Sequence, residues 1–131
     1  MQLKLTNQQI LTLEQAINSL DAKPYKISAL ARLALARNAG TLAAASTAFN
    51  RAKSALVTQH GGEKGEIGPA HGNWTAFVKD YEELLHAAVE IDLHQIGLDE
   101  LKTEANEAAG TDIPINVLTA LFTLVKSVSI N

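Results

Sequence analysis

The beginning of the chain has the hydrophobic pattern of a short strand followed by an amphipathic helix. Leu3 and Leu5 alternate with polar neighbours, which predicts a strand over residues 2–6. Residues 6–9, Thr-Asn-Gln-Gln, match a capping box, in which the Thr and Gln side chains satisfy free backbone N–H groups. We expect the helix to end before Pro24, because the residue preceding a proline is displaced from the helical region. Its apolar residues recur at spacings of three and four, at Ile10, Leu13, Ile17 and Leu20.

Residues 25–59 are rich in alanine and predict a long helix. Eleven of the 28 residues from Ala29 to Leu56 are alanine, the residue with the highest helix propensity. Gly40 lies where the apolar stripe changes register, so the pattern leaves open one helix or two, and we favour one helix with a kink or a short interruption. Beyond Gly40 the stripe has the heptad spacing of a coiled coil, at Leu42, Ala45, Phe49, Ala52 and Leu56.

Residues 60–72 contain five of the eight glycines and separate two helical patterns. A cluster of glycine with proline is typical of a loop, and we expect this one to be flexible. A third helix, capped by Asn73, then carries its own apolar stripe. The pattern predicts that this helix packs antiparallel on the long helix, with the glycine-rich loop as the connection. Its contacting residues are expected to be Trp74, Phe77, Tyr81 and Leu84.

The polar and apolar residues from 89 to 94 alternate as in a strand, although residues 89–91 also continue the third helix. We favour a strand over about residues 90–94, because the strand at residues 2–6 needs a partner to be stable. A short polar helix follows between residues 97 and 110, and a final helix over residues 115–128. The expected fold is therefore mainly α: an antiparallel hairpin of long helices in a helical bundle, with a short two-stranded β-sheet. We expect a single helical domain over residues 1–131.

The final helix has two apolar stripes, and the only charged residue between Ile113 and Asn131 is Lys126. One stripe consists of Ile115, Leu118, Phe122 and Val125. A helix that is apolar over so much of its circumference lies in the centre of a core or in an interface. We expect the second stripe to contact another copy of the chain, giving a homodimer or a larger homo-oligomer. This predicted interface comprises Val117, Leu121, Leu124 and Val128.

The net charge of −3 divides unevenly along the chain. Residues 1–60 hold seven Lys and Arg against two acidic residues, a balance of +5, and residues 61–131 hold four against twelve, a balance of −8. We expect the two halves to pack together and their fields to cancel, because phosphate-binding cations usually occur in denser clusters or with aromatic residues. The alternative is a basic surface for nucleic acid. It would use Lys23, Lys26, Arg32, Arg37, Arg51 and Lys53.

Few residue patterns suggest catalytic or metal chemistry. The chain has no cysteine, which excludes disulfides and thiol chemistry. His60 and His71 flank the glycine-rich loop, but their separation matches no structural zinc pattern, and we interpret them as solvated loop histidines. Glu82, His86 and Glu90 recur every four residues, so one helix face could present them to a divalent ion. We interpret them instead as a solvated face, because they alternate with the apolar stripe of the third helix. No serine lies in a Gly-x-Ser-x-Gly motif. We therefore expect no enzymatic activity, no cofactor and no metal. No stretch approaches the roughly 20 apolar residues of a membrane span, so we expect no membrane partner.

Several short motifs occur in an order and spacing that resembles a family of small phage and prophage proteins of unknown function. Leu-Lys-Leu-Thr-Asn-Gln at residues 3–8 precedes the Ala-, Leu- and Arg-rich stretch and the glycine-rich insert. Tyr-Glu-Glu-Leu-Leu at 81–85, Val-Glu-Ile-Asp-Leu at 89–93, Leu-Asp-Glu-Leu at 98–101 and Asp-Ile-Pro at 112–114 follow. The resemblance implies a phage origin, hence the host cytoplasm or the virion, and no known activity. We therefore expect a non-enzymatic accessory or assembly protein that acts through protein–protein contacts, with a nucleic-acid-binding accessory protein as the alternative.

Overall fold

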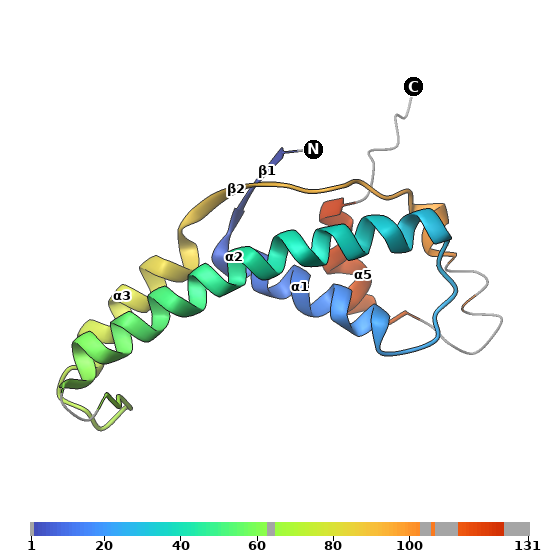
Figure 1. Cartoon of the computed structure of the whole chain (residues 1–131). Coiled ribbons are helices and arrows are strands. Elements are labelled where there is room, and N and C mark those ends of the chain that lie inside the picture. The colour runs from blue at the N-terminus through green and yellow to red at the C-terminus, as the bar shows by residue number, and fades with distance from the viewer. Residues whose placement is uncertain (1, 63–64, 103–105, 107–112, 125–131) are drawn as a thin grey trace.

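The computed structural model describes residues 2–62, 65–102, 106 and 113–124, and this part of the chain is mainly helical. The long helix α2 lies beside α1 over one part of its length and beside α3 over the other, and α5 packs against α1 (Figure 1). The helical hairpin and the small sheet that the sequence predicts are both present. The main elements are β1 (Gln2–Thr6), α1 (Asn7–Asp21), α2 (Ala29–Gly61), α3 (Trp74–His86), β2 (Ala88–Asp92) and α5 (Ile115–Leu121).

The start of α1 confirms the predicted capping box. The Gln9 backbone N–H donates to Thr6 Oγ1 at 3.2 Å, and the Thr6 backbone N–H donates to Gln9 Oε1 at 2.9 Å. These two bonds satisfy donors that an uncapped helix would leave free. The helix ends at Asp21, before Pro24, as expected. The predicted apolar stripe is buried, at Ile10, Leu13, Ile17 and Leu20.

The α2 helix is a single helix of 33 residues, about 50 Å long at 1.5 Å per residue. It continues through Gly40 without a break, which decides between the one-helix and two-helix alternatives. It begins at Ala29 rather than at residue 25, because Ser28 is the cap: its Oγ accepts from the Ala31 N–H at 3.1 Å. Tyr25 and Ile27 therefore lie outside the helix, with both side chains buried in the core.

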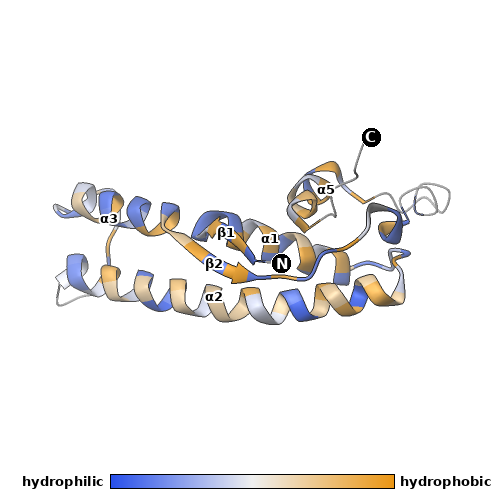
Figure 2. Ribbon diagram, turned by 90° about the horizontal axis from the view of Figure 1, so that it is seen from above, coloured by the Kyte–Doolittle hydropathy of each residue, from blue (hydrophilic) through white to orange (hydrophobic). Residues whose placement is uncertain are grey.

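The two strands pair antiparallel, with Leu3 opposite Ile91 and Leu5 opposite Val89. The competition between helix and strand is thus decided in favour of the strand, which begins two residues earlier than expected. This pairing places the four apolar side chains on one face of the sheet, whereas Val89 and Ile91 would have no common buried face in a helix. Figure 2 shows β2 running between α2 and β1.

One hydrophobic core contains residues from both strands, from α1, α2 and α5, and from the short 3₁₀ helices. Leu42 of α2 is fully buried in this core, together with residues of α1. Leu42 takes no part in the aromatic contacts of the α2–α3 hairpin. The hairpin has its own contact, in which the rings of Phe49 and Tyr81 have centroids 6.1 Å apart. The predicted contact between α2 and α3 is therefore confirmed at Phe49, whereas Leu42 packs in the main core.

The structure describes the later elements only in part. Between residues 97 and 102 the chain forms the 3₁₀ helix Leu98–Leu101, and most of the polar helix predicted up to residue 110 lies outside the described residues. The described part of the final helix consists of α5 and a further 3₁₀ turn, Phe122–Leu124. Residues 125–128 of the predicted helix also lie outside the described residues.

Candidate interaction surface

One exposed side of α2 forms a continuous strip along the helix. Its residues are three or four positions apart, so they project from the same side of the helix. All eight are exposed, and we call them the outer strip: Leu30, Leu33, Arg37, Thr41, Ala44, Ala48, Arg51 and Ala55. Leu30 is 75% exposed and Leu33 is 47% exposed, although leucine is normally a core residue. The outer strip is therefore an apolar surface whose only charges are two arginines.

The local sequence explains both the shape and the charge of this strip. Its alanines have short side chains, so the backbone of another helix can approach closely along most of its length. No acidic residue occurs between Asp21 and Glu63, so α2 contains basic residues and no carboxylate. The arginines of the strip, Arg37 and Arg51, form no ion pair with any residue in the described part of the chain. Both guanidinium groups are available to a partner.

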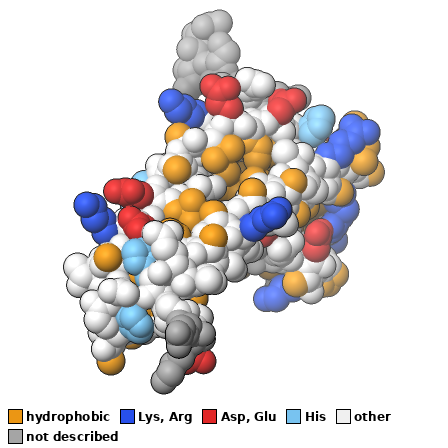
Figure 3. Space-filling view, turned by 60° about the vertical axis from the view of Figure 1, so that its left-hand side comes forward, with side chains coloured by type: hydrophobic (Ala, Val, Ile, Leu, Met, Phe, Trp, Pro, Cys, Tyr) orange, Lys and Arg blue, Asp and Glu red, His pale blue; other side chains and the backbone are white. Residues whose placement is uncertain are grey.

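A cavity of about 220 Å³ adjoins the outer strip at Ala48. The cavity lies near the end of α3 and the beginning of β2, and six of its seven lining residues are apolar. Hydrophobic side chains gather near the centre of the face that Figure 3 presents, with charged side chains around them. The cavity is large enough for one large apolar side chain of a partner. Its lining residues are Asn7, Ala45, Ala48, Phe49, Ala52, Leu84 and Val89.

The six cations predicted for nucleic acid are dispersed in the structure. Two of them precede α2, and the other four are distributed over about 32 Å of that helix at 1.5 Å per residue. They point in different directions around the helix axis, so they form no dense basic cluster. The set is Lys23, Lys26, Arg32, Arg37, Arg51 and Lys53.

Two of these cations are engaged within the chain. Arg32 Nη2 donates to the Tyr25 carbonyl at 2.6 Å, which holds the segment before α2 against the helix. The Lys53 ammonium lies 5.5 Å from the centroid of the Tyr81 ring, a cation–π distance. Both side chains therefore have structural contacts that compete with binding to phosphate.

The predicted interface on the final helix is wrong for the three residues that can be checked. Val117 is 5% exposed, and Leu121 and Leu124 are fully buried in the chain's own core. The reason is that α5 docks on α1 through this stripe, which leaves Ile115 and Phe122 of the other stripe outside, while Leu118 is half-buried against the core. Ile115 is 81% exposed and Phe122 is 55% exposed. The remaining member of the predicted interface, Val128, lies outside the described residues.

His60 is the last but one residue of α2 and joins it to α3. Its Nε2 lies 2.8 Å from Asp80 Oδ2, and its ring meets the edge of Phe77 with centroids 6.1 Å apart. Its carbonyl accepts from Asn73 Nδ2 at 2.9 Å, while His71 Nδ1 accepts from the Asn73 backbone N–H at 3.0 Å. The expectation of a solvated loop histidine is thus wrong for His60, which has a structural role at the end of the hairpin.

The repeat of Glu82, His86 and Glu90 does not form one helix face. Glu82 and His86 are in α3, where the His86 ring bonds the Glu82 carbonyl at 2.8 Å, but Glu90 is in β2. Within the described ranges of the chain, no three His, Cys, Asp or Glu side chains are placed to hold a metal ion together. A shared metal site at these three positions therefore has no support from the geometry.

Two asparagines are fully buried, and no pattern in the sequence predicts their burial. Asn38 Oδ1 accepts from the His94 backbone N–H at 2.7 Å, and its Nδ2 donates to the His94 carbonyl at 3.0 Å. Asn106 pairs in the same way with the N–H and carbonyl of Lys26, at 2.7 and 2.9 Å. Each amide takes the place that a neighbouring strand would occupy, so both asparagines hold an extended segment to the fold and present no free polar group to a ligand.

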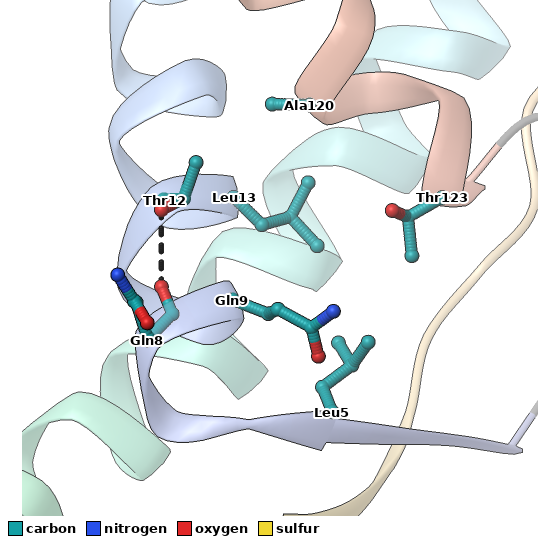
Figure 4. A pocket seen from close by; sticks show the side chains of 7 residues that line it. All are labelled: Leu5, Gln8, Gln9, Thr12, Leu13, Ala120 and Thr123. Atoms are coloured by element: carbon teal, nitrogen blue, oxygen red, sulfur yellow. Dashed lines mark hydrogen bonds between the residues drawn. The ribbon is translucent and has the colours of Figure 1, made fainter. Parts of the chain in front are cut away.

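A second cavity, of about 260 Å³, lies between the beginning of α1 and α5 (Figure 4). None of its seven lining residues is ionisable, and Gln9 and Leu13 point from α1 toward Thr123. The Thr12 hydroxyl donates to the Gln8 carbonyl at 3.0 Å, so part of its polar lining is already used by the helix. The lining therefore offers neither an acid–base pair nor a set of metal ligands. It comprises Leu5, Gln8, Gln9, Thr12, Leu13, Ala120 and Thr123.

Gly61 gives a test of how the glycine-rich loop packs. A Cβ at this position would lie 2.7 Å from the Glu66 carbonyl oxygen, so the backbone of the loop must move to accommodate a side chain. We expect Gly61→Ala to lower the free energy of unfolding by about 1–3 kcal/mol in thermal denaturation, as overpacking does. Gly68→Ala is the matched control, since a Cβ there meets nothing within 4 Å.

The loop itself is expected to contribute little beyond this contact. Replacement of residues 62–70 by a short Gly/Ser linker should leave the thermal midpoint nearly unchanged, because closure depends weakly on loop length. In that background Gly61→Ala should be neutral. A large fall in the thermal midpoint on loop replacement would contradict the first expectation and would show that the loop is part of the packed structure.

Comparisons of this chain with protein-family models, with curated proteins and with solved structures find no match. In the described part of the chain, no helix combines the length and the apolar character needed to cross a membrane.

Proposed function

We propose that this protein is a non-enzymatic accessory or assembly protein of phage type, which acts through protein–protein contacts in the host cytoplasm or in the virion. The observation that supports this proposal is the exposure of large apolar side chains on two separate helices, α2 and α5. Singly scattered apolar residues are normal on a protein surface, but a helix face that combines several of them is typical of an interaction site. The resemblance to small phage proteins supplies the biological setting.

The exposed face of α5 is proposed as the contact between two copies of the chain. Ile115 and Phe122 are seven positions apart and so lie on one side of the final helical segment. No charged residue occurs between Ile113 and Leu124, so two such faces can meet without like-charge repulsion. An isologous contact of this kind closes a homodimer, the commonest arrangement of soluble homo-oligomers.

We expect light scattering to give a dimeric or larger mass at micromolar concentration, and Phe122→Glu to give a monomer. A carboxylate at the centre of an apolar contact loses its hydration without gaining a partner, which disfavours the complex. Since Phe122 is 55% exposed, the variant is expected to fold normally, as circular dichroism would show.

Thr58→Glu is the control for this experiment, because it places the same charge at an exposed position of α2. It should leave the oligomeric mass unchanged. A monomeric wild-type chain, or a Phe122→Glu variant with the wild-type oligomeric mass, would contradict self-association through α5.

The alternative function is that of a nucleic-acid-binding accessory protein. It is favoured by one observation, the absence of any acidic residue in α2 beside its four Lys and Arg. The dispersion of these cations and the contacts of Arg32 and Lys53 count against it. Binding to phosphate would weaken steeply as salt is raised, which distinguishes it from an apolar contact.

A further inference from the structure

We propose that the outer strip of α2 docks an amphipathic helix of a protein partner that has acidic side chains along the margins of its apolar face. This inference rests on the proposed role in protein–protein contact and concerns a different surface from the self-contact on α5. The partner's apolar residues would cover Leu30 and Leu33 and fill the cavity beside Ala48, and its carboxylates would pair with Arg37 and Arg51.

The apolar part of the strip defines the length of the partner helix. Leu30 and Ala48 are 18 positions apart, which is about 27 Å along α2, so a partner of about 20 helical residues reaches both. The heptad-like spacing of the strip matches the periodicity of a second helix packed along it. A large side chain in the cavity would supply the buried anchor that protein interfaces commonly have near their centre.

The charges of the strip argue against a second copy of α2 as the occupant. In a parallel pair Arg37 would face Arg37, and in an antiparallel pair that overlaps fully Arg37 would lie within about one turn of Arg51. Like charges at these positions repel, whereas carboxylates about 21 Å apart on another helix would be attracted to both. The exposed face of α5 is also unsuitable, because it carries no carboxylate.

The apolar residues argue against nucleic acid as the occupant of this strip. Leu30 and Leu33 would contribute nothing to the binding of a phosphate backbone, and they adjoin Arg37 on the same side of the helix. Only two cations, about four turns apart, project from the strip. An acidic amphipathic helix uses both the apolar and the charged members of the surface, which phosphate does not.

The test uses two synthetic helical peptides of about 20 residues, long enough by the spacing above. One has leucines at heptad spacing flanked by glutamates, and the other has lysine in place of every glutamate. Fluorescence anisotropy with the full-length protein is expected to show saturable binding of the acidic peptide alone. The double variant Arg37→Glu and Arg51→Glu should weaken that binding by about tenfold or more and should bind the lysine peptide instead, because the charges across the contact are reversed.

Two further variants separate this contact from general electrostatic attraction. Leu33→Ser should weaken the binding of the acidic peptide, although it leaves the charges of the strip intact. The control pair, Lys4→Glu with Lys79→Glu, lies at exposed positions outside α2 and should leave the binding of the acidic peptide unchanged. Equal losses from the control pair, or no saturable binding, would overturn the proposal. Binding of a mixed-sequence duplex DNA would also overturn it, if that binding is lost in the Arg37 and Arg51 double variant and is unchanged by Leu33→Ser. None of these results depends on the α5 contact, so failure of this proposal and failure of the Phe122→Glu test of self-association can be distinguished.

Discussion

Replacement of Phe49 by alanine is expected to lower the free energy of unfolding by about 3–5 kcal/mol, the usual cost of removing a buried aromatic ring. Phe49 is 5% exposed, its ring contacts that of Tyr81, and it lines the cavity between α2 and α3. Its loss would enlarge that cavity and remove the main aromatic contact of the hairpin. Chemical denaturation followed by circular dichroism measures the change.

Phe122→Ala is the matched control for this prediction, since the same substitution at a 55% exposed position removes little buried surface. It should change the free energy of unfolding by less than about 1 kcal/mol in the monomer. A change below about 0.5 kcal/mol for Phe49→Ala would mean that the hairpin register is wrong.

Replacement of Asn38 by alanine is expected to cost about 2–4 kcal/mol, because the N–H and the carbonyl of His94 both lose their partner. Each of these groups costs roughly 1–3 kcal/mol when it is left without a hydrogen bond inside a protein. Asn38 is fully buried, so water does not readily replace its amide. Denaturation measures the global cost, and faster hydrogen exchange of the His94 amide should accompany it.

Asn50→Ala provides the comparison on the same helix, because Asn50 is exposed. It should change stability by no more than about 0.5 kcal/mol. Equal effects of the two substitutions would show that Asn38 acts only through helix propensity, and the pairing with His94 would then not be the reason for its burial.

The elements that depend on near neighbours could be predicted from the sequence. The capping box at Thr6, the stripe of α1 and the helical character of residues 29–59 are encoded within a few positions, because caps, propensities and the periodicities of 3.6 and 2 act locally. The pairing of the strand at residues 2–6 with a later strand was also predictable, since a lone strand is unstable. The exposed strip of α2 has the same local basis, although its significance depends on which side of the helix is left uncovered.

Only the tertiary structure decided between alternatives that the local pattern treats as equal. Both stripes of the final helix are apolar, and the docking of α5 on α1 buries Leu121 and exposes Phe122, the reverse of the prediction. Asn38 and His94 are 56 residues apart, and Asn106 and Lys26 are 80 apart, so no spacing in the sequence relates them. Burial and pairing of this kind depend on which distant segments share the core, whereas helix caps and hydrophobic periodicity depend only on residues within one or two turns.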